Sequence, residues 1–141
     1  MKVKVKKLHP NAIIPTYATD GSGAFDMYAA ECDNGGWGLQ YHNDTFGTGL
    51  SFEIPEGHVM LVFSRSGHGF NYGASLVNSV GVIDSDYRGE VVVKLNTEII
   101  ATVGDRIAQA IILPIPRITF QETDELTTTE RGTNGFGSTG R

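Results

Sequence analysis

The stretch LVNSVGVIDSDYRGEVVVKLN, residues 76–96, places a polar turn between two runs of strand-forming side chains. Before the turn, Val80, Val82 and Ile83 favour β structure. After it, Val91, Val93 and Leu95 alternate with a second set that is polar except for Val92, the period of two that is typical of a half-buried strand. The stretch therefore predicts two strands joined by an acidic turn, DSDYRG. That turn is either a solvated surface loop or part of a cleft.

Short strand-like runs continue on both sides of this stretch. Val3 and Val5 alternate with lysines in the run MKVKVKKL, which predicts a strand with one solvent-facing side. Eighteen glycines and many β-branched residues favour short strands and tight turns, and no segment has a convincing helical period. We therefore expect an all-β domain. Further strands are expected at residues 24–30, 50–54, 58–63 and 104–113, with a last one at 118–120.

Length, charge and cysteine content bound the class of protein. The 141 residues suffice for one domain. A net charge of −5 argues against a nucleic-acid-binding surface, which needs a basic face. A nucleotide remains open, because a few arginines, backbone amides and a divalent metal can hold phosphates. No membrane span or signal peptide is predicted. Cys32 is the single cysteine, which favours a reducing compartment such as the cytoplasm.

The end of one apolar run carries an arginine between small residues. Residues 58–63 are typical of a strand buried on both faces, and Ser64, Arg65, Ser66 and Gly67 follow directly. Backbone N–H groups, the Ser66 hydroxyl and the Arg65 guanidinium could converge there on an anion. An ordinary Ser/Gly turn is the simpler alternative.

Two polar side chains stand inside predicted strands. Asp26 is the single acid of the run at residues 24–30, where it either caps a backbone amide or belongs to a site. Gln109 shares a predicted strand face with Ile107 and Ile111. A buried amide without a partner costs about 1–3 kcal/mol. Gln109 should therefore either have a hydrogen-bond partner inside the fold or face a ligand.

Apolar content falls sharply after the last predicted strand. We therefore divide the chain into a β domain at residues 1–121 and a flexible C-terminal arm at residues 122–141. The end of the arm, RGTNGFGSTGR, offers glycine amides, hydroxyls and a cation to phosphates, and one aromatic ring to a base. It has no lysine of the G-K-[ST] type, so it is not a Walker loop.

Five motifs in this order resemble the trimeric deoxyuridine triphosphatase (dUTPase) family, and the resemblance spans nearly the whole chain. The third and fifth motifs are the specific ones, and GTGLSFEIPEGH at residues 47–58 is also similar to the family. The motifs are AFDMYA (24–29), SRSG (64–67), NSVGVIDSDYRGE (78–90), GDRIAQ (104–109) and RGTNGFGSTG (131–140).

The resemblance implies a distorted, jelly-roll-like β-barrel that assembles as a homotrimer. Each of three active sites would combine residues of all three subunits, and the C-terminal arm would close over a neighbouring site. The implied reaction is hydrolysis of dUTP to dUMP and pyrophosphate, which keeps uracil out of DNA and supplies dUMP for thymidylate synthesis. No nucleic-acid or membrane partner is implied.

The resemblance also implies roles for the residues of the opening stretch. Asp84 would be the general base that activates a water molecule for attack on the α-phosphorus. Tyr87 would lie under the deoxyribose, where a 2′-hydroxyl would meet its ring. The resemblance assigns no role to Asp86 and Arg88, which we expect to support the loop. The pyrimidine edge would be bound by the Asn78 side chain and by the main chain of Gly81, Val82 and Ile83.

The remaining motifs would hold the phosphates. Ser66 and Gly67 would contact the phosphate chain, and Gln109 would reach the α-phosphate as a second catalytic residue. Mg²⁺ would be chelated by the triphosphate, with Asp26 touching its waters. Arg65 and Asp105 would act either at phosphates or as a structural ion pair, and we favour the ion pair. From the arm, Phe136 would stack on uracil, and the outer phosphates would be bound by Arg131, Gly137, Ser138 and Thr139.

Some positions depart from the family pattern. Ser64 replaces a common proline, His68 and Gly69 replace a more apolar pair, and residues 35–43 are unusually polar. None of these changes removes a group that the reaction requires. Two other functions remain in view, a deoxycytidine triphosphate deaminase with the same fold and a non-catalytic nucleotide-binding module. The sequence DSDYR favours the triphosphatase.

Overall fold

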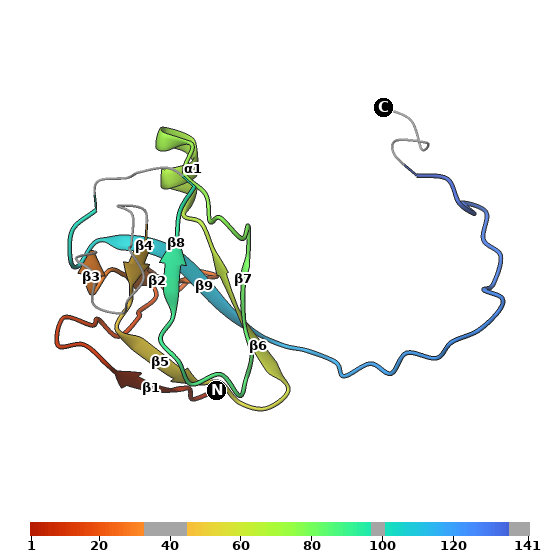
Figure 1. Cartoon of the computed structure of the whole chain (residues 1–141), viewed down its shortest axis with the longest axis horizontal. Coiled ribbons are helices and arrows are strands. Elements are labelled where there is room, and N and C mark those ends of the chain that lie inside the picture. Colours follow the sequence, from red (N-terminus) through yellow and green to blue (C-terminus); the bar gives the residue numbers. More distant parts are fainter. Residues whose placement is uncertain (33–44, 97–100, 136–141) are drawn as a thin grey trace.

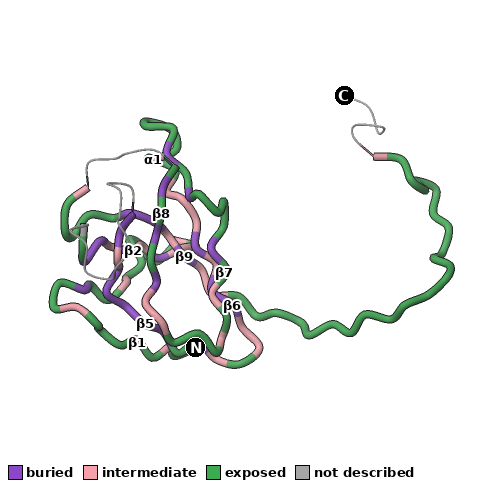
Figure 2. The backbone as a smooth tube through the Cα atoms, in the orientation of Figure 1, coloured by how far each residue is buried: buried purple, intermediate pink, exposed green. Residues whose placement is uncertain are grey.

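The computed structural model describes residues 1–32, 45–96 and 101–135 of the chain. Within these ranges the chain is mostly β, with short strands arranged in three antiparallel sheets around one core (Figure 1). Figure 2 shows that the buried residues are concentrated in these sheets. The prediction of a β domain is therefore confirmed, with one helix as an exception.

The largest sheet has four strands and carries several of the predicted site residues. Its strand order is β2-β9-β6-β7, and all neighbouring strands are antiparallel. β9 is the central long strand, and it pairs with β6 over residues 109–114. The bounds are β2 (Phe25–Tyr28), β9 (Arg106–Pro114), β6 (His58–Phe63) and β7 (Gly81–Ile83).

Two smaller sheets complete the β structure. One has the order β3-β4-β8, and the other pairs β1 with β5. The expected lysine-rich strand is β1, in which Val5 is partly buried and the three lysines are exposed. The bounds are β3 (Glu31–Cys32), β4 (Thr45–Gly47), β8 (Val92–Lys94), β1 (Lys4–Lys7) and β5 (Leu50–Glu53).

The core forms because alternate strand residues point inward between the sheets. Met27, Leu50, Met60 and Ile107 are completely buried, and Phe46 is 2% exposed. These side chains come from five strands, β2, β4, β5, β6 and β9, which belong to all three sheets, so one core joins the sheets. Burying side chains of this size stabilises a fold by about 1.5–3 kcal/mol each.

The stretch at residues 76–96 forms the predicted strands, but β7 and β8 belong to different sheets. β7 pairs with β6, whereas β8 pairs with β4. The two segments meet only at their outer ends, where Leu76 bridges to Leu95. The predicted alternation is confirmed, because Val91, Val93 and Leu95 are buried while the residues between them are exposed. The stretch is therefore an open hairpin with space between its arms.

The expectation of no helix is wrong, because α1 (Ser66–Tyr72) follows β6. None of its residues is buried, so it has no apolar stripe that a sequence pattern could reveal. It ends at Gly73, whose φ of 64° is the left-handed conformation that favours glycine. This seven-residue segment is the one helix in the described ranges, and no described helix could span a membrane.

The chain leaves the sheets after β9 as an extended segment (Figure 1). The last strand expected, at residues 118–120, is absent, because these residues have no pairing partner in this part of the chain. Ile118, Phe120 and Leu126 are 69%, 89% and 87% exposed. Apolar side chains this exposed indicate a segment that lacks its packing surface within one chain.

Gly49, directly before β5, lies close to His9 and Ala12 and leaves no room for a side chain. Its φ is 63°, and a Cβ there would lie 2.7 Å from His9 Cβ and 2.9 Å from Ala12 Cβ. We expect Gly49→Ala to lower the free energy of unfolding by about 2–4 kcal/mol, since it adds backbone strain to overpacking.

Gly57 supplies the matched control. Its φ is 75°, but a Cβ there would meet nothing within 4 Å. Gly57→Ala should cost only about 1 kcal/mol of backbone strain. Urea unfolding at one fixed protein concentration compares the two, and equal costs for both variants would contradict the crowding at Gly49.

Candidate active site

The first group of predicted site residues lies where β2, β9 and β6 are adjacent. Asp26 pairs in register with Gln109, and Gln109 pairs with Phe63, two residues before Arg65. The Arg65 Nε donates to Asp26 Oδ1 at 3.3 Å, and the Arg106 Nη1 donates to Asp26 Oδ2 at 3.4 Å. The Asp26 side chain is only 15% exposed. The Asp26 carboxylate is thus a largely buried negative charge that is paired with two arginines.

Two of the open alternatives are decided here. Gln109 has a partner inside the fold, because its Nε2 donates to Ser64 O at 3.1 Å. The ion pair favoured for Arg65 exists, but its partner is Asp26 and the expectation of Asp105 is wrong. Asp105 instead accepts hydrogen bonds from the Thr102 backbone and hydroxyl, and these bonds lower the pKa of Asp105. The predicted Arg65–Asp105 pair failed because Asp105 is needed to close its own turn.

The donor set fits a magnesium ion that the substrate carries and does not fit one that the protein cages. No group of three or more His, Cys, Asp or Glu side chains within the described ranges could hold a metal. Asp26 already meets two arginines, yet each carboxylate oxygen can accept more than one hydrogen bond. Asp26 could therefore accept hydrogen bonds from water molecules on an ion that phosphates chelate.

His68, a departure from the family pattern, lies on α1 beside Arg65. Its Nε2 is 3.5 Å from Arg65 Nη1, and its ring lies 6.4 Å from that of Tyr72. Its Nδ1 is buried and has no hydrogen-bond partner among the described residues. Burial lowers the pKa of His68 most, the Arg65 charge lowers it further, and Asp105 partly offsets both. His68 is therefore neutral at neutral pH.

Acidification should weaken the fold through His68. A lowered folded-state pKa means that the unfolded chain takes up the proton first as pH falls below the ordinary value of 6.5. The stability that the neutral His68 contributes at neutral pH is therefore lost as the pH falls through this range. We expect the unfolding free energy of the wild type, relative to His68→Leu, to fall between about pH 7.5 and pH 5.5. Urea titrations at both pH values measure this difference, and a difference that does not change with pH would contradict it.

The second group of residues surrounds the space inside the open hairpin. A cavity of about 260 Å³ is lined by both arms of the hairpin and by Val62 of β6. The chain turns sharply before β7, where Ser79 has a φ of 62° and Val80 N donates to Asn78 O at 2.6 Å. The cavity contacts the four residues predicted to bind the pyrimidine: Asn78, Gly81, Val82 and Ile83. The structure thus brings this predicted set together.

Gly81 lies where β7 pairs with Val62 of β6, and the space there suits a residue without a side chain. A Cβ at Gly81 would lie 3.2 Å from Val62 Cβ and 3.7 Å from Asn78 Nδ2. A side chain at this position would press on Val62 of β6, whereas its distance to the Asn78 amide would be an ordinary contact. The glycine therefore keeps the floor of the cavity open.

Tyr87 is fixed by the residues that follow it. Its hydroxyl donates to Glu90 O at 3.0 Å, and a Cβ at Gly89 would collide with the tyrosine ring. The Arg88 Nη1 donates to Ser85 O and Tyr87 O at 2.7 and 2.8 Å. Arg88 thus supports the loop, as expected, and the exposed Tyr87 ring lies against Gly89.

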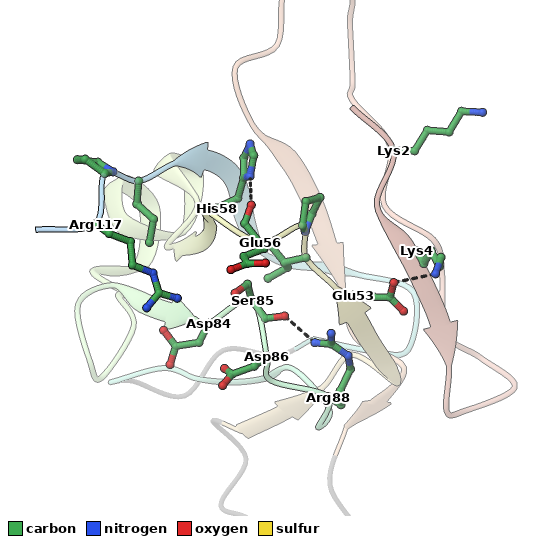
Figure 3. A pocket seen from close by; sticks show the side chains of 14 residues that line it. Lys2, Lys4, Glu53, Glu56, His58, Asp84, Ser85, Asp86, Arg88 and Arg117 are labelled. Carbon is green, nitrogen blue, oxygen red and sulfur yellow. Dashed lines mark hydrogen bonds and ion pairs between the residues drawn. The ribbon is translucent and has the colours of Figure 1, made fainter.

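Asp84 faces a second, larger cavity on the other side of the same loop. This cavity has a volume of about 900 Å³ and lies between the N-terminal segment, the turn before β6 and residues 84–88 (Figure 3). Figure 3 shows the Arg117 guanidinium on the same side as the Asp84 carboxylate. Asp84 is exposed, and its carboxylate has no hydrogen-bond partner in the described part of the chain. A carboxylate that is free in this way can accept a proton from water.

One chain does not bring all the predicted residues to one place. Val62 pairs with Gly81, and from that pair the chain runs one way to Ser66 and the other way to Asp84. Because β6 and β7 are antiparallel, Ser66 and Asp84 follow opposite ends of this pair of strands. Arg131 lies in the exposed arm, where its Nε donates to Asn134 O at 2.9 Å. Phe136, Gly137, Ser138 and Thr139 lie outside the described residues.

Sequence reasoning missed two contributors to these groups. Arg106, inside the motif GDRIAQ, is the second arginine on Asp26. Lys94, on β8, lines the hairpin cavity. Only the pairing of β2 with β9 and the opening of the hairpin place these side chains, and neither is visible in a local pattern.

Comparison with known proteins gives a consistent family. A family model described as dUTPase matches residues 10–140. The deoxyuridine 5′-triphosphate nucleotidohydrolase of Nautilia profundicola is 42% identical over 145 residues, covering 100% of both chains. The enzyme of that name from Helicobacter pylori is 42% identical over 147 residues, covering 99% of this chain and 97% of its own. The dUTPase of Staphylococcus bacteriophage 80alpha, solved with dUpNHpp, has the same fold, with a TM-score of 0.78, 24% identity and 99% of each chain covered.

Proposed function

The chain belongs to the dUTPase family, and from that premise we propose that it hydrolyses dUTP to dUMP and pyrophosphate in a site shared between three copies. The β domain at residues 1–121 would close into a distorted jelly-roll barrel in the trimer. Residues 122–141 would form the arm that covers a neighbouring site.

The observation that carries the shared site is the order of groups along β7. The base-binding residue Asn78 lies before β7 and the water-activating Asp84 lies after it, so a nucleotide along this strand has its phosphates at the Asp84 end. Ser66 of the same chain lies at the opposite end, since Val62 pairs with Gly81. This order supports a site in which the phosphate-binding Ser66 would come from another copy.

At the nucleoside end, the hairpin cavity supports recognition of uracil. The backbone N–H and C=O groups of Gly81, Val82 and Ile83 would pair with the O4 and N3–H of uracil, a pattern that opposes the amino group of cytosine. The Asn78 amide adds a donor and an acceptor. Tyr87, fixed over Gly89, would lie against the deoxyribose and leave no room for a 2′-hydroxyl.

At the phosphate end, Asp84 would take a proton from the attacking water. The new bond forms between the water oxygen and the α-phosphorus, and the bond from the α-phosphorus to the bridging oxygen breaks, so that pyrophosphate leaves. From a second copy, Ser66, Gly67 and Gln109 would contact the phosphate chain. Arg65 holds Asp26 in place beside them. Mg²⁺, when bound with the nucleotide, supplies charge neutralisation at the phosphates.

The arm of a third copy would complete the site. Arg131 has donors left for phosphate, because the structure uses only its Nε. Phe136 would stack on the base, and Gly137, Ser138 and Thr139 would supply amides and hydroxyls. Ordering this segment only on a nucleotide explains why its described part makes no packing contact of its own.

Assays with the four common deoxynucleoside triphosphates and dUTP test the proposed function. We expect pyrophosphate from dUTP, at least about 100-fold less from dCTP, and no ammonia from either. Ammonia released from dCTP would instead identify a deaminase. Binding of dUTP without pyrophosphate release would identify a non-catalytic nucleotide-binding module.

A further inference from the structure

The hairpin cavity contains one cation that the proposed function leaves without a task. Lys94 ends β8 and lines the cavity together with Asn78, Gly81, Val82 and Ile83. The usual role of a lysine on the exposed face of a strand is to keep that face soluble. Three features of the structure point to a different role here.

The first feature is the position of its backbone. Lys94 O accepts a hydrogen bond from Val77 N at 3.0 Å, and Leu95 bridges to Leu76. These contacts hold β8 against the segment that leads into Asn78. Lys94 therefore lies at the end of the hairpin that carries Asn78, away from Asp84.

The second feature is the direction of its side chain. Val93 and Leu95 point into the core, so the alternation of the strand turns Lys94 to the opposite face. Val92, on that same face, is 44% exposed and also lines the cavity. Lys94 is thus an exposed residue among those that line the cavity.

The third feature is its charge. No described residue gives the Lys94 ammonium an ion pair or a hydrogen bond. Apart from Asn78, the other side chains around the cavity are apolar. Lys94 is exposed in the single chain, so its ammonium is available to a polar group that enters the cavity.

We infer that Lys94 is a substrate-binding residue whose ammonium donates a hydrogen bond to a carbonyl oxygen of uracil. The inference rests on the proposed function, which places the base in this cavity. A phosphate is a poor candidate for this contact, because the phosphate chain leaves the cavity at the opposite, Asp84 end. Lys94 therefore contributes to affinity for the nucleoside and not to the chemical step.

Direct binding of dUMP, followed by calorimetry on the full-length chain, tests this role. Lys94→Met keeps most of the side-chain length and removes the charge, and Lys94→Arg restores a donor. Lys6→Met is the matched control, because Lys6 is exposed on β1 and lines neither cavity. We expect Lys94→Met to weaken dUMP about tenfold, Lys94→Arg to recover part of that loss, and Lys6→Met to change nothing.

The kinetics of dUTP hydrolysis separate this contact from other roles. Lys94→Met should raise KM by about the same tenfold factor and leave kcat within about twofold, as expected for uniform binding. Unchanged dUMP affinity would overturn the inference. A loss seen with dUTP and not with deoxyuridine or dUMP would also overturn it, since the contact would then be to the outer phosphates. Failure of the wild type to hydrolyse dUTP while it binds dUMP would defeat the proposed function and leave the role of Lys94 measurable.

Discussion

Asp84→Asn is expected to lower kcat for dUTP by about 10²–10⁴, the usual contribution of a general base. The amide has nearly the shape of the carboxylate but cannot take a proton from water. Because Asp84 is exposed and its carboxylate makes no hydrogen bond in the described structure, the replacement should not disturb the fold. Binding of dUTP should survive, since the hairpin cavity lies on the other side of the loop.

Asp86→Asn is the matched control for this experiment. Asp86 is also exposed and lines the same large cavity, two positions further along the loop. It should retain near-normal turnover. Single-turnover kinetics with saturating enzyme measures both variants without a contribution from product release. Equal losses in the two variants would show a general electrostatic effect of the cavity, and unchanged turnover in Asp84→Asn would remove Asp84 from its role.

A chain that ends at Glu130 is expected to stay folded and trimeric but to lose at least about 100-fold in kcat/KM for dUTP. The missing segment carries Arg131 and the residues that would close over the phosphates and the base. Removing preorganised donors to developing phosphate charge typically costs about 10²–10³ in rate. The fold should not suffer, because the hydrogen bonds of residues 122–135 are local to the arm: those of Thr123, Glu125, Thr129, Arg131, Gly132 and Asn134.

Three measurements separate the role of the arm from a structural one. Light scattering should report the same molar mass for the shortened and the full-length chain. Thermal unfolding at equal concentration should give the same midpoint within a few degrees. Affinity for dUMP should be reduced less than affinity for dUTP, because the hairpin cavity is intact. Dissociation of the shortened chain into monomers would make the arm a structural element of the assembly.

Local patterns in the sequence predicted the strands well and their partners poorly. The alternation of Val91, Val93 and Leu95 with polar residues fixed which face of β8 is buried. It could not show that β8 joins β4 while β7 joins β6, because sheet membership depends on distant segments. The short helix α1 escaped prediction because it buries nothing and so carries no periodic apolar signal.

The candidate site shows the same division. The residue types of Asp26, Arg65 and Gln109 indicated a polar site, and the register of β2, β9 and β6 brings them together. Their partners were not readable in advance. Arg65 forms its ion pair with Asp26, 39 positions away in the sequence, whereas Asp105, the expected partner, accepts a hydrogen bond from Thr102 in its own turn. Lys94 was overlooked because it lines a cavity only as a result of the opening between the two arms of the hairpin.

A site shared between copies is the central claim, and complementation between two inactive variants tests it most directly. The Asp84→Asn chain lacks the general base and retains its arm, whereas the chain ending at Glu130 retains Asp84 and lacks the end of its arm. Mixed trimers, formed by unfolding and refolding the two chains together in equal amounts, should contain sites that take Asp84 from one chain and the arm from another. Random assembly gives about one quarter of such sites, so the mixture should regain about one quarter of wild-type dUTP turnover, while either variant refolded alone stays inactive. Activity of the refolded mixture no greater than the sum of the two separate variants would contradict a shared site.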